Sequence, residues 1–308
     1  MLHTRSLSLV RHTPLLHLHR IHEGPGKIYG KLDYLQPAGS VKDRAAYQVI
    51  ADAREQGLLG AGQAVVEMTS GNMGAGLAFV CKQFGHPFTA VMSMGNSPER
   101  VRAMRAFGAE VVLVDQVDGV PGRVTGRDLQ AAMDHAEQLA RDTDAYYVDQ
   151  FNNESGVRAH YRTTGPEIYQ DLPQIQAFVA CVGSGGTFVG TSRYLKEQNP
   201  DIRCIAIEPA NAAVLSTGNL NKGAHIIQGT GYGFVPPKWD GSVADDIQTV
   251  TDEEVRQMAL RLSREQGLYC GYSAGANVAV AQRILEAHPD IQHIATMICD
   301  TGYKYSDL

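Results

Sequence analysis

Hydrophobic and polar positions follow two rhythms along this chain, and from residue 64 onward the two rhythms alternate. Short runs of β-branched and other apolar residues predict strands, and segments with an apolar residue every three or four positions predict helices. Strands are expected at 64–68, 88–92, 110–114, 146–149, 178–182, 204–208 and 294–299. Helices are expected at 72–84, 98–107, 129–141, 187–198, 251–266 and 275–287. Such βαβα alternation favours open, mostly parallel sheets covered by helices.

The chain shows no internal repeat, no low-complexity tract and no long linker. A stretch rich in glycine and proline, residues 118–126, is expected to be a surface loop within the first half. Because no linker separates the two halves, we expect two lobes packed together with a cleft between them.

Composition describes an ordinary globular protein and excludes several classes. The 308 residues carry a net charge of -6, with 44% hydrophobic and 19% charged residues, which gives no electrostatic reason to bind nucleic acid or anionic lipid. No apolar run approaches the roughly 18 residues of a membrane span, and the N-terminus has no signal-peptide pattern. These features predict a cytoplasmic protein. The five cysteines are far apart in apolar segments and are expected to be reduced, and the histidines of the first 22 residues are interpreted as surface or interface residues rather than metal ligands.

The segment Pro37–Arg44 places one lysine, Lys42, behind a turn of small residues and at the start of a predicted helix. An ammonium near the positive end of the helix dipole is destabilised and loses its proton more readily. A neutral lysine can act as a nucleophile or form a Schiff base. An exposed lysine at a helix start remains the alternative.

A glycine-rich turn, Gly183–Thr187, follows a predicted apolar strand and leads into a helix. Its glycines allow backbone amides to converge on a phosphate, and Thr187 adds a hydroxyl. A dinucleotide fingerprint would need glycine where Phe188 stands, and no Gly-Lys-Thr/Ser follows to complete a Walker motif. The pattern therefore favours a cradle for a single phosphate monoester, with a tight turn lacking any ligand as the alternative.

Two further predicted helix starts carry small hydroxyl residues. Thr69 and Ser70 stand before one, and Ser273 stands in Gly271–Ala276 at another. Either set could simply cap its helix. The functional alternatives are a carboxylate site formed by Thr69 and Ser70, and a hydrogen bond from Ser273 to a heterocyclic nitrogen.

Two more segments are candidates for lining the cleft. Residues 228–236 contain three glycines in five positions, which suits a loop that approaches a ligand with its backbone or moves. Gln150 ends the first half of the chain and could extend into the cleft.

A nucleophilic lysine, a single-phosphate cradle, a neutral hydroxyl and a carboxylate-binding helix start describe a pyridoxal 5'-phosphate site. Over about residues 5–305 the chain resembles the fold-type II pyridoxal-phosphate enzymes of the cysteine synthase and cystathionine β-synthase family. The resemblance rests on the ordered set of the lysine motif, Thr69-Ser70-Gly71-Asn72, Gly183–Thr187 and the Gly-x-Ser-x-Gly of 271–275. Residues 164–168 and 300–305 also match.

The resemblance implies an α/β architecture of the tryptophan synthase β type, with two open, twisted, mostly parallel sheets and the active site in the interdomain cleft. It also implies a large cofactor-binding domain, 1–36 plus 147–308, and a small mobile substrate-binding domain, 37–146. A homodimer is expected, with a small amino-acid substrate, no nucleic acid or membrane partner, and serine acetyltransferase as a candidate protein partner.

The resemblance also implies roles for individual residues. Lys42 would be the catalytic residue, joined to the cofactor and moving the substrate's α-proton. The other implied cofactor contacts are Asn72, Gly183, Ser184, Gly185, Gly186, Thr187 and Ser273. The implied substrate contacts are Thr69, Ser70, Gly71, Met73, Gln150, Gly229 and Tyr232; no metal is implied.

The implied reaction is β-replacement on an activated serine through an α-aminoacrylate intermediate. The first expectation is cysteine synthase, which makes cysteine and acetate from O-acetylserine and sulfide. Tyr232 and the segment around Tyr272 resemble the cystathionine β-synthases, and Met73 departs from the threonine usual in both groups. These three residues could select a different nucleophile or activated serine, so cystathionine β-synthase or another synthase of β-substituted alanines stays open. A cofactor-loaded homologue that binds the serine acetyltransferase C-terminus is the alternative of a different class.

Overall fold

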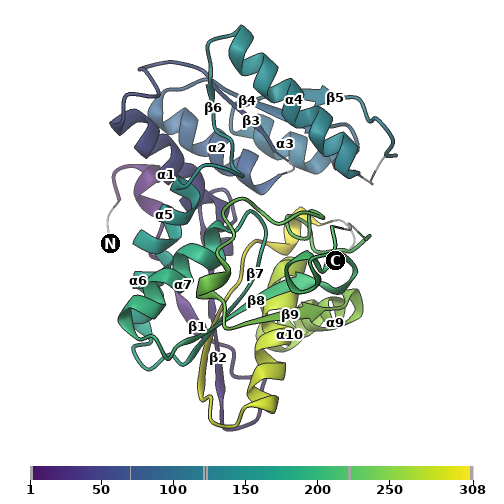
Figure 1. Cartoon of the computed structure of the whole chain (residues 1–308). Helices are drawn as coiled ribbons and strands as arrows, with labels where there is room; N and C mark the ends of the chain where they lie inside the picture. The colour runs from purple at the N-terminus through teal and green to yellow at the C-terminus, as the bar shows by residue number, and fades with distance from the viewer. Residues whose placement is uncertain (1–2, 70, 121, 123, 221–222, 306–307) are drawn as a thin grey trace. The chain divides into compact units, whose positions relative to one another are not determined.

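The computed structural model describes residues 3–69, 71–120, 122, 124–220, 223–305 and 308. The chain divides into two compact units (Figure 1). Unit 1 comprises Met1–Val10 and Gln36–Gly156, and unit 2 comprises Arg11–Leu35 and Val157–Leu308. Each unit has its own hydrophobic core.

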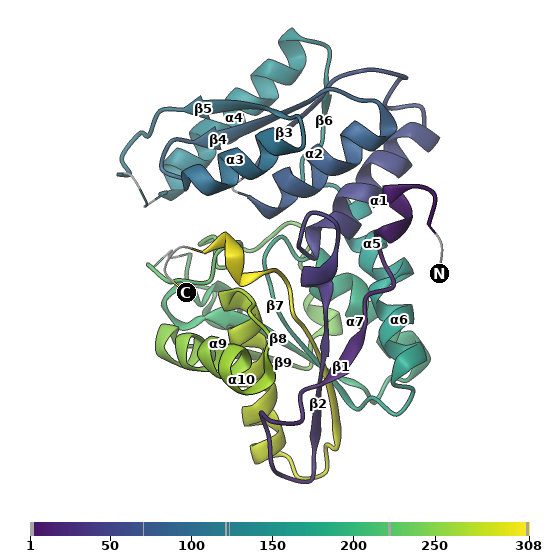
Figure 2. The ribbon, with the colours of Figure 1, turned by 180° about the vertical axis from the view of Figure 1, so that it is seen from behind.

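Unit 1 contains a four-stranded sheet in the order β5-β4-β3-β6, and all its pairings are parallel. Figure 2 shows α2 and α3 on one side of this sheet and α4 on the other. Because both faces are covered, every residue of β3 is buried. The strands are β3 (Val65–Met68), β4 (Phe88–Ser93), β5 (Glu110–Val114) and β6 (Tyr146–Tyr147). The helices are α1 (Lys42–Glu55), α2 (Asn72–Phe84), α3 (Pro98–Ala106) and α4 (Gly126–Asp142).

Helix starts in unit 1 follow from local chemistry. Helix α3 begins with Pro98, whose missing N–H costs nothing in the first turn. Helix α4 begins after a capping box, in which the Thr125 hydroxyl accepts from the Asp128 N–H and the Asp128 carboxylate accepts from the Thr125 N–H. The predicted loop before α4 is confirmed at its described residues up to Thr125, while Gly126 already belongs to α4 and 121 and 123 lie outside the description.

Unit 2 contains a six-stranded sheet in the order β1-β2-β10-β7-β8-β9. The β1–β2 pair is antiparallel and all other pairs are parallel. In Figures 1 and 2, α6 and α7 lie on one side of this sheet and α9 and α10 on the other. The strands are β1 (Leu15–His17), β2 (Lys27–Lys31), β7 (Ala177–Cys181), β8 (Arg203–Pro209), β9 (Asp246–Val250) and β10 (His293–Met297). The helices are α5 (Ser155–Arg162), which begins at the end of unit 1, α6 (Thr164–Asp171), α7 (Gly186–Gln198), α8 (Val214–Thr217), α9 (Asp252–Gln266) and α10 (Tyr272–Ala287). Turns of 3-10 helix lie at Asp33–Leu35, Ala210–Ala212, Gly241–Val243 and Gly302–Lys304, and another, Ser6–Leu9, belongs to unit 1.

The expected fold class is confirmed: both sheets are mostly parallel and flanked by helices. The helix expected at 72–84 and the strand expected at 110–114 match α2 and β5 to the residue. Strands β1, β2 and β9 were not predicted. Strand β1 has only three half-buried residues, and β2 begins and ends with lysine, so neither shows a clear apolar run.

Candidate functional site

Lys42 is the first residue of α1, as predicted, and its backbone N–H donates to the Ser40 hydroxyl at 3.3 Å. Helix α2 packs closely on this turn because it carries Gly76 there. A Cβ atom at Gly76 would lie 3.3 Å from the Lys42 carbonyl oxygen and 3.2 Å from the Ala46 Cβ. Helix α2 therefore contacts the first turn of α1 at a residue one helical turn after its own start.

The turn before α2 depends on a glycine and a threonine. Gly71 precedes Asn72, the first residue of α2, with φ at 155°, a backbone conformation that other residues rarely adopt. The Thr69 hydroxyl accepts from the Gly74 N–H at 2.8 Å and from the Gly71 N–H at 3.3 Å. Capping of α2 by Thr69 is therefore real, and a hydroxyl that accepts in this way still has its own hydrogen to donate.

Two other residues proposed for the same turn have different outcomes. Ser70 lies outside the described residues. Met73 is 4% exposed, and its side chain belongs to the core of unit 1. Burial of the Met73 side chain leaves its backbone as the part of the residue suited to contact a substrate.

Gln150 is half-buried at the end of β6 in unit 1, and a buried carboxyl group lies beside it. The Gln150 side-chain amide donates to the Met68 carbonyl at 2.9 Å, and its backbone N–H lies 3.4 Å from Glu67 Oε1. Burial raises the pKa of Glu67 to about 8, and the Gln150 backbone N–H opposes this rise. At neutral pH Glu67 is therefore largely protonated, which motif reading of the sequence did not reveal.

In unit 2, the glycine turn Gly183–Thr187 links β7 to α7. Gly185 is the N-cap of α7, with φ at 92°, and no side chain caps the helix. A Cβ at Gly183 would lie 2.2 Å from the Gly229 carbonyl oxygen, and one at Gly185 would lie 3.3 Å from the Lys238 backbone. Neighbouring backbone therefore surrounds the turn, and its amides at the α7 start are suited to an anion.

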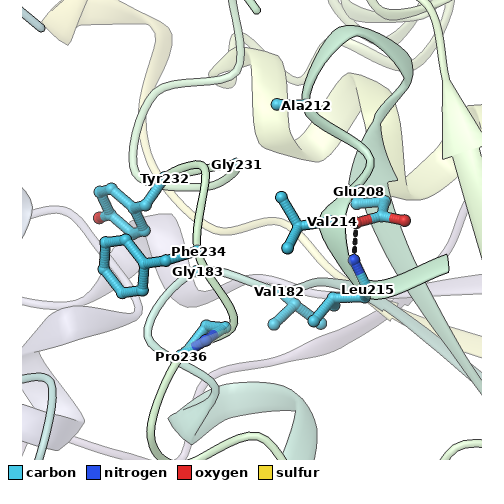
Figure 3. A pocket seen from close by; sticks show the side chains of 10 residues that line it. All are labelled: Val182, Gly183, Glu208, Ala212, Val214, Leu215, Gly231, Tyr232, Phe234 and Pro236. Atoms are coloured by element: carbon cyan, nitrogen blue, oxygen red, sulfur yellow. Dashed lines mark hydrogen bonds between the residues drawn. The ribbon is translucent and has the colours of Figure 1, made fainter. Parts of the chain in front are cut away.

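The structure brings the 228–236 loop to the same turn. Gly229 packs on Gly183, and a small pocket is lined by both Gly183 and Tyr232 (Figure 3). The Tyr232 ring stacks on Phe234, with centroids 5.8 Å apart and an interplanar angle of 23°. Figure 3 shows this aromatic pair on one side of the pocket and Val214 on the other.

Ser273 lies in the first turn of α10, 8% exposed, and is held beside the end of β7. The Cys181 thiol is 4.0 Å from the Ser273 carbonyl oxygen. Asn277 fixes this arrangement, because it accepts from the Cys181 N–H at 2.8 Å and donates to the Met297 carbonyl at 2.8 Å. Ser273 is thus adjacent to the strand that leads into the glycine turn.

Tyr272 is part of the core of unit 2 instead of a lining residue. It is 1% exposed, its hydroxyl accepts from Arg256 at 3.1 Å, and its ring meets Tyr305 edge-on at 5.3 Å. The expectation that Tyr272 helps select the substrate is therefore corrected: an aromatic side chain in this position fills the core.

The predicted site residues thus form two groups, one in each unit. Lys42, Thr69, Gly71, Asn72, Met73 and Gln150 belong to unit 1, and Gly183–Thr187, Gly229, Tyr232 and Ser273 belong to unit 2. Sequence reasoning missed Glu67, Asn277 and the buried His160. Of these three, only His160 could have been singled out from the sequence, because it stands four residues before the matched segment 164–168.

In the described part of the chain, no group of three or more His, Cys, Asp or Glu side chains is arranged to hold a metal ion. No helix in the same residues has the length and apolar character needed to cross a bilayer. All five cysteines are free thiols.

The chain is similar to known proteins over nearly its whole length. The model of the family described as "Pyridoxal-phosphate dependent enzyme" matches residues 7–300. A probable cysteine synthase of Bacillus subtilis is 39% identical over 302 residues, which cover 96% of this chain and 94% of the relative. The crystal structure of O-ureido-L-serine synthase superposes with a TM-score of 0.92 at 36% identity, covering 100% of this chain and 95% of that one. The O-acetylserine dependent cystathionine beta-synthase of Helicobacter pylori gives 0.90 at 32% identity, covering 100% and 98%.

Proposed function

Because the chain belongs to the family of pyridoxal-phosphate dependent enzymes, we propose that it is a cysteine synthase. It is a pyridoxal-phosphate dependent, β-substituting enzyme. The specific reaction we assign is replacement of the acetoxy group of O-acetylserine by sulfide. The Cβ–O bond breaks, a Cβ–S bond forms, and cysteine and acetate are released.

The cofactor is pyridoxal 5'-phosphate, and the turn in unit 2 fits its phosphate. The observation that carries the proposal is the close approach of Gly229 to Gly183, which leaves no room for a side chain at position 183 of the turn. The start of α7, which no side chain caps, then offers N–H groups to an anion, and Thr187 offers a hydroxyl. When bound, the cofactor acts as an electron sink for negative charge at the substrate's α-carbon.

Each remaining residue has a task that suits its chemistry. Lys42 joins the cofactor through its amine and carries the α-proton, a role for which the helix start favours the neutral form. Asn72 would donate to the cofactor's 3'-oxygen. Ser273 would offer a neutral hydroxyl to the ring nitrogen, whereas an aspartate at this position would keep that nitrogen protonated and make the ring a stronger electron sink. The neutral partner would therefore favour early loss of the β-leaving group.

We assign binding of the substrate's α-carboxylate to residues of unit 1. Thr69 has a hydroxyl hydrogen to donate while it caps α2, and the Gly71–Asn72 backbone opens the helix whose dipole favours an anion. Gln150 adds an amide from the end of β6, and Ser70 is assigned here on sequence alone. In this proposal unit 2 holds the cofactor's phosphate and ring nitrogen, whereas unit 1 supplies Lys42, Asn72 and the carboxylate site.

One observation favours a second candidate for the nucleophile. Tyr232 stacks on Phe234 at the pocket that also touches the glycine turn, which is a wide apolar surface beside the site assigned to the cofactor. Such a surface suits a carbon-bearing thiol better than bare sulfide. Homocysteine is therefore the alternative nucleophile, which would make the enzyme an O-acetylserine dependent cystathionine β-synthase.

The test is a matrix of substrates on the purified holoenzyme. O-acetylserine, O-phosphoserine and serine are each combined with sulfide, homocysteine and an amine, and products are identified by mass. We expect O-acetylserine to change the cofactor absorbance before any nucleophile is added, and sulfide to give cysteine. Cystathionine as the main product would assign the second candidate. If no activated serine changes the absorbance, the protein is a cofactor-loaded binding homologue, and the assignment fails.

A further inference from the structure

A buried histidine lies behind the glycine turn and joins two threonine hydroxyls. His160 of α5 is 1% exposed. Its Nε2 is 3.2 Å from the hydroxyl of Thr187, the last residue of the turn, and its Nδ1 is 2.8 Å from the hydroxyl of Thr164 in α6. Neither the fold nor the proposed reaction assigns a task to this imidazole.

Glycines hold this histidine in place by letting three helices approach closely. A Cβ at Gly190 of α7 would lie 2.3 Å from the Val157 carbonyl oxygen and 3.0 Å from the His160 Cβ. A Cβ at Gly165 of α6 would lie 2.7 Å from the Tyr194 Cβ of α7. Thr187, Gly190 and Tyr194 recur at three- and four-residue spacing, so they share one face of α7. That face is where His160 meets Thr187.

The direction of the hydrogen bond between His160 and Thr187 decides what Thr187 can do. A threonine hydroxyl has one hydrogen to donate, and a phosphate oxygen only accepts. If Nε2 accepted that hydrogen, Thr187 would turn lone pairs toward the phosphate and repel it. If Nε2–H donates instead, the Thr187 hydrogen is available for the phosphate.

We propose that His160 is a positioning residue for the cofactor: it donates Nε2–H to Thr187 and thereby directs the Thr187 hydrogen to the phosphate. Thr164 holds the other end of the ring, since its hydroxyl donates to Nδ1 when the ring is neutral. Each hydrogen bond of the series Thr164–His160–Thr187 is therefore donated in the direction of the glycine turn. This inference rests on the proposed function, because it takes the turn as the phosphate site.

Two substitutions of His160 distinguish the roles of its two ring nitrogens, Nε2 and Nδ1. The amide nitrogen of His160→Gln can take the place of Nε2 and donate to Thr187, whereas the shorter amide of His160→Asn reaches only the Nδ1 position. We expect His160→Asn to lose the cofactor roughly tenfold more readily and His160→Gln to stay within about threefold of the natural protein. Cofactor retention is read from the absorbance of dialysed holoenzyme, and the ³¹P chemical shift of the bound phosphate is read independently of activity.

A double-mutant cycle tests whether His160 acts through Thr187. In a Thr187→Val background, His160→Asn is expected to change cofactor retention by less than about twofold, because the hydroxyl it orients is gone. The control is His86→Asn in unit 1, which removes another buried imidazole, one whose Nδ1 lies 2.9 Å from the Gln63 carbonyl oxygen. It should leave both readouts unchanged.

Three outcomes would overturn the inference. His160→Asn could retain the cofactor as well as the natural protein does. Alternatively, the effects of His160→Asn and Thr187→Val on cofactor retention could be additive. Equal losses in His160→Gln and His160→Asn, with equally lowered thermal unfolding temperatures, would show a purely structural role. A natural protein that binds no pyridoxal phosphate would instead refute the proposed function itself.

Discussion

Lys42 is the residue on which the assigned chemistry depends most directly. It begins α1, where the peptide dipoles favour the neutral amine that a covalent link to the cofactor needs. The proposal therefore requires this one side chain both to hold the cofactor and to move a proton.

Lys42→Ala should lower turnover by roughly 10²- to 10⁴-fold, since it removes a proton-transfer group and the covalent link. Borohydride treatment followed by peptide mass analysis should find the cofactor on Lys42 in the natural protein and on no residue in the variant. Lys82→Ala, which removes an exposed lysine of α2, is the matched control. Full activity in Lys42→Ala would refute the assignment.

Glu67 shows how burial alone can change the state of a residue. Strand β3 is covered on both faces, so the charged carboxylate is poorly solvated and its pKa rises to about 8 from 4.5. The folded protein therefore binds a proton that the unfolded chain has already released at pH 6 or 7. Stability from this group is complete below about pH 4.5 and is lost as the pH rises toward 8.

Glu67→Gln should remove this pH dependence, because the amide does not ionise. The free energy of unfolding of the natural protein should fall relative to the variant between pH 5 and pH 8, by an amount of order a few kcal/mol. Urea unfolding at several pH values measures the difference. Glu110→Gln, at an exposed strand start, is the control and should run parallel to the natural protein. A parallel curve for Glu67→Gln would contradict the argument.

At the scale of elements, helices in both units approach their neighbours through glycines. Gly76 lets α2 approach α1, Gly190 lets α7 approach α5, and Gly183 lets its turn meet Gly229. The added Cβ would meet backbone atoms at each of these places, so relief would require the helix or loop to move. The side chains proposed to form the site thus depend on residues that have no side chain.

Gly183→Ala is expected to displace the 228–236 loop, because its Cβ would lie 2.2 Å from the Gly229 oxygen. Overpacking of this kind costs about 1–3 kcal/mol of stability, and the distorted turn should bind cofactor at least roughly tenfold more weakly. Thermal unfolding and equilibrium titration with pyridoxal phosphate measure the two effects. Gly126→Ala, at the first residue of α4 with nothing within 4 Å, should be neutral or slightly stabilising. Unchanged cofactor affinity in Gly183→Ala would remove the turn from the site.

At the scale of the whole molecule, the first 35 residues supply part of the unit 2 sheet. Strand β2 pairs with β10 from the other end of the chain. Lys31 of β2 is 1% exposed, and its ammonium lies 2.9 Å from the Glu167 carboxylate and 2.5 Å from the Thr13 carbonyl. A buried charge pair thus ties the N-terminal strands to α6.

Lys31→Met should destabilise the protein, because it removes the ammonium that lies 2.9 Å from the buried Glu167 carboxylate. Adding Glu167→Gln should recover part of this loss, since the carboxylate charge that Lys31 balanced is then removed as well. Chemical denaturation of the single and double variants gives the coupling. Equal stability of the natural protein and Lys31→Met would show that the pair contributes nothing.

Much of this protein was determined by local sequence. The alternation of apolar runs and amphipathic segments predicted most of the parallel strands and helices from residue 64 onward, because the periods of 2 and 3.6 are set by backbone geometry. It did not predict β9, α5 or α6. The lysine motif and the two glycine and hydroxyl turns, read in order, indicated the cofactor and the family. These signals are local, since each depends on residues within a few positions of one another.

Tertiary structure decided the rest, because it depended on contacts between distant residues. Strands β1, β2 and β9 form because neighbouring strands pair with them, although their own sequences show no clear apolar run. Packing placed Met73 and Tyr272 in cores, although their positions in the motifs suggested contact with substrate. Burial raised the pKa of Glu67, and the close contact of α5 with α7 brought His160 to Thr187 across 27 positions of sequence. Burial and hydrogen-bond partners exist only once the chain is folded, so no motif could have revealed the protonation of Glu67 or the partner of His160.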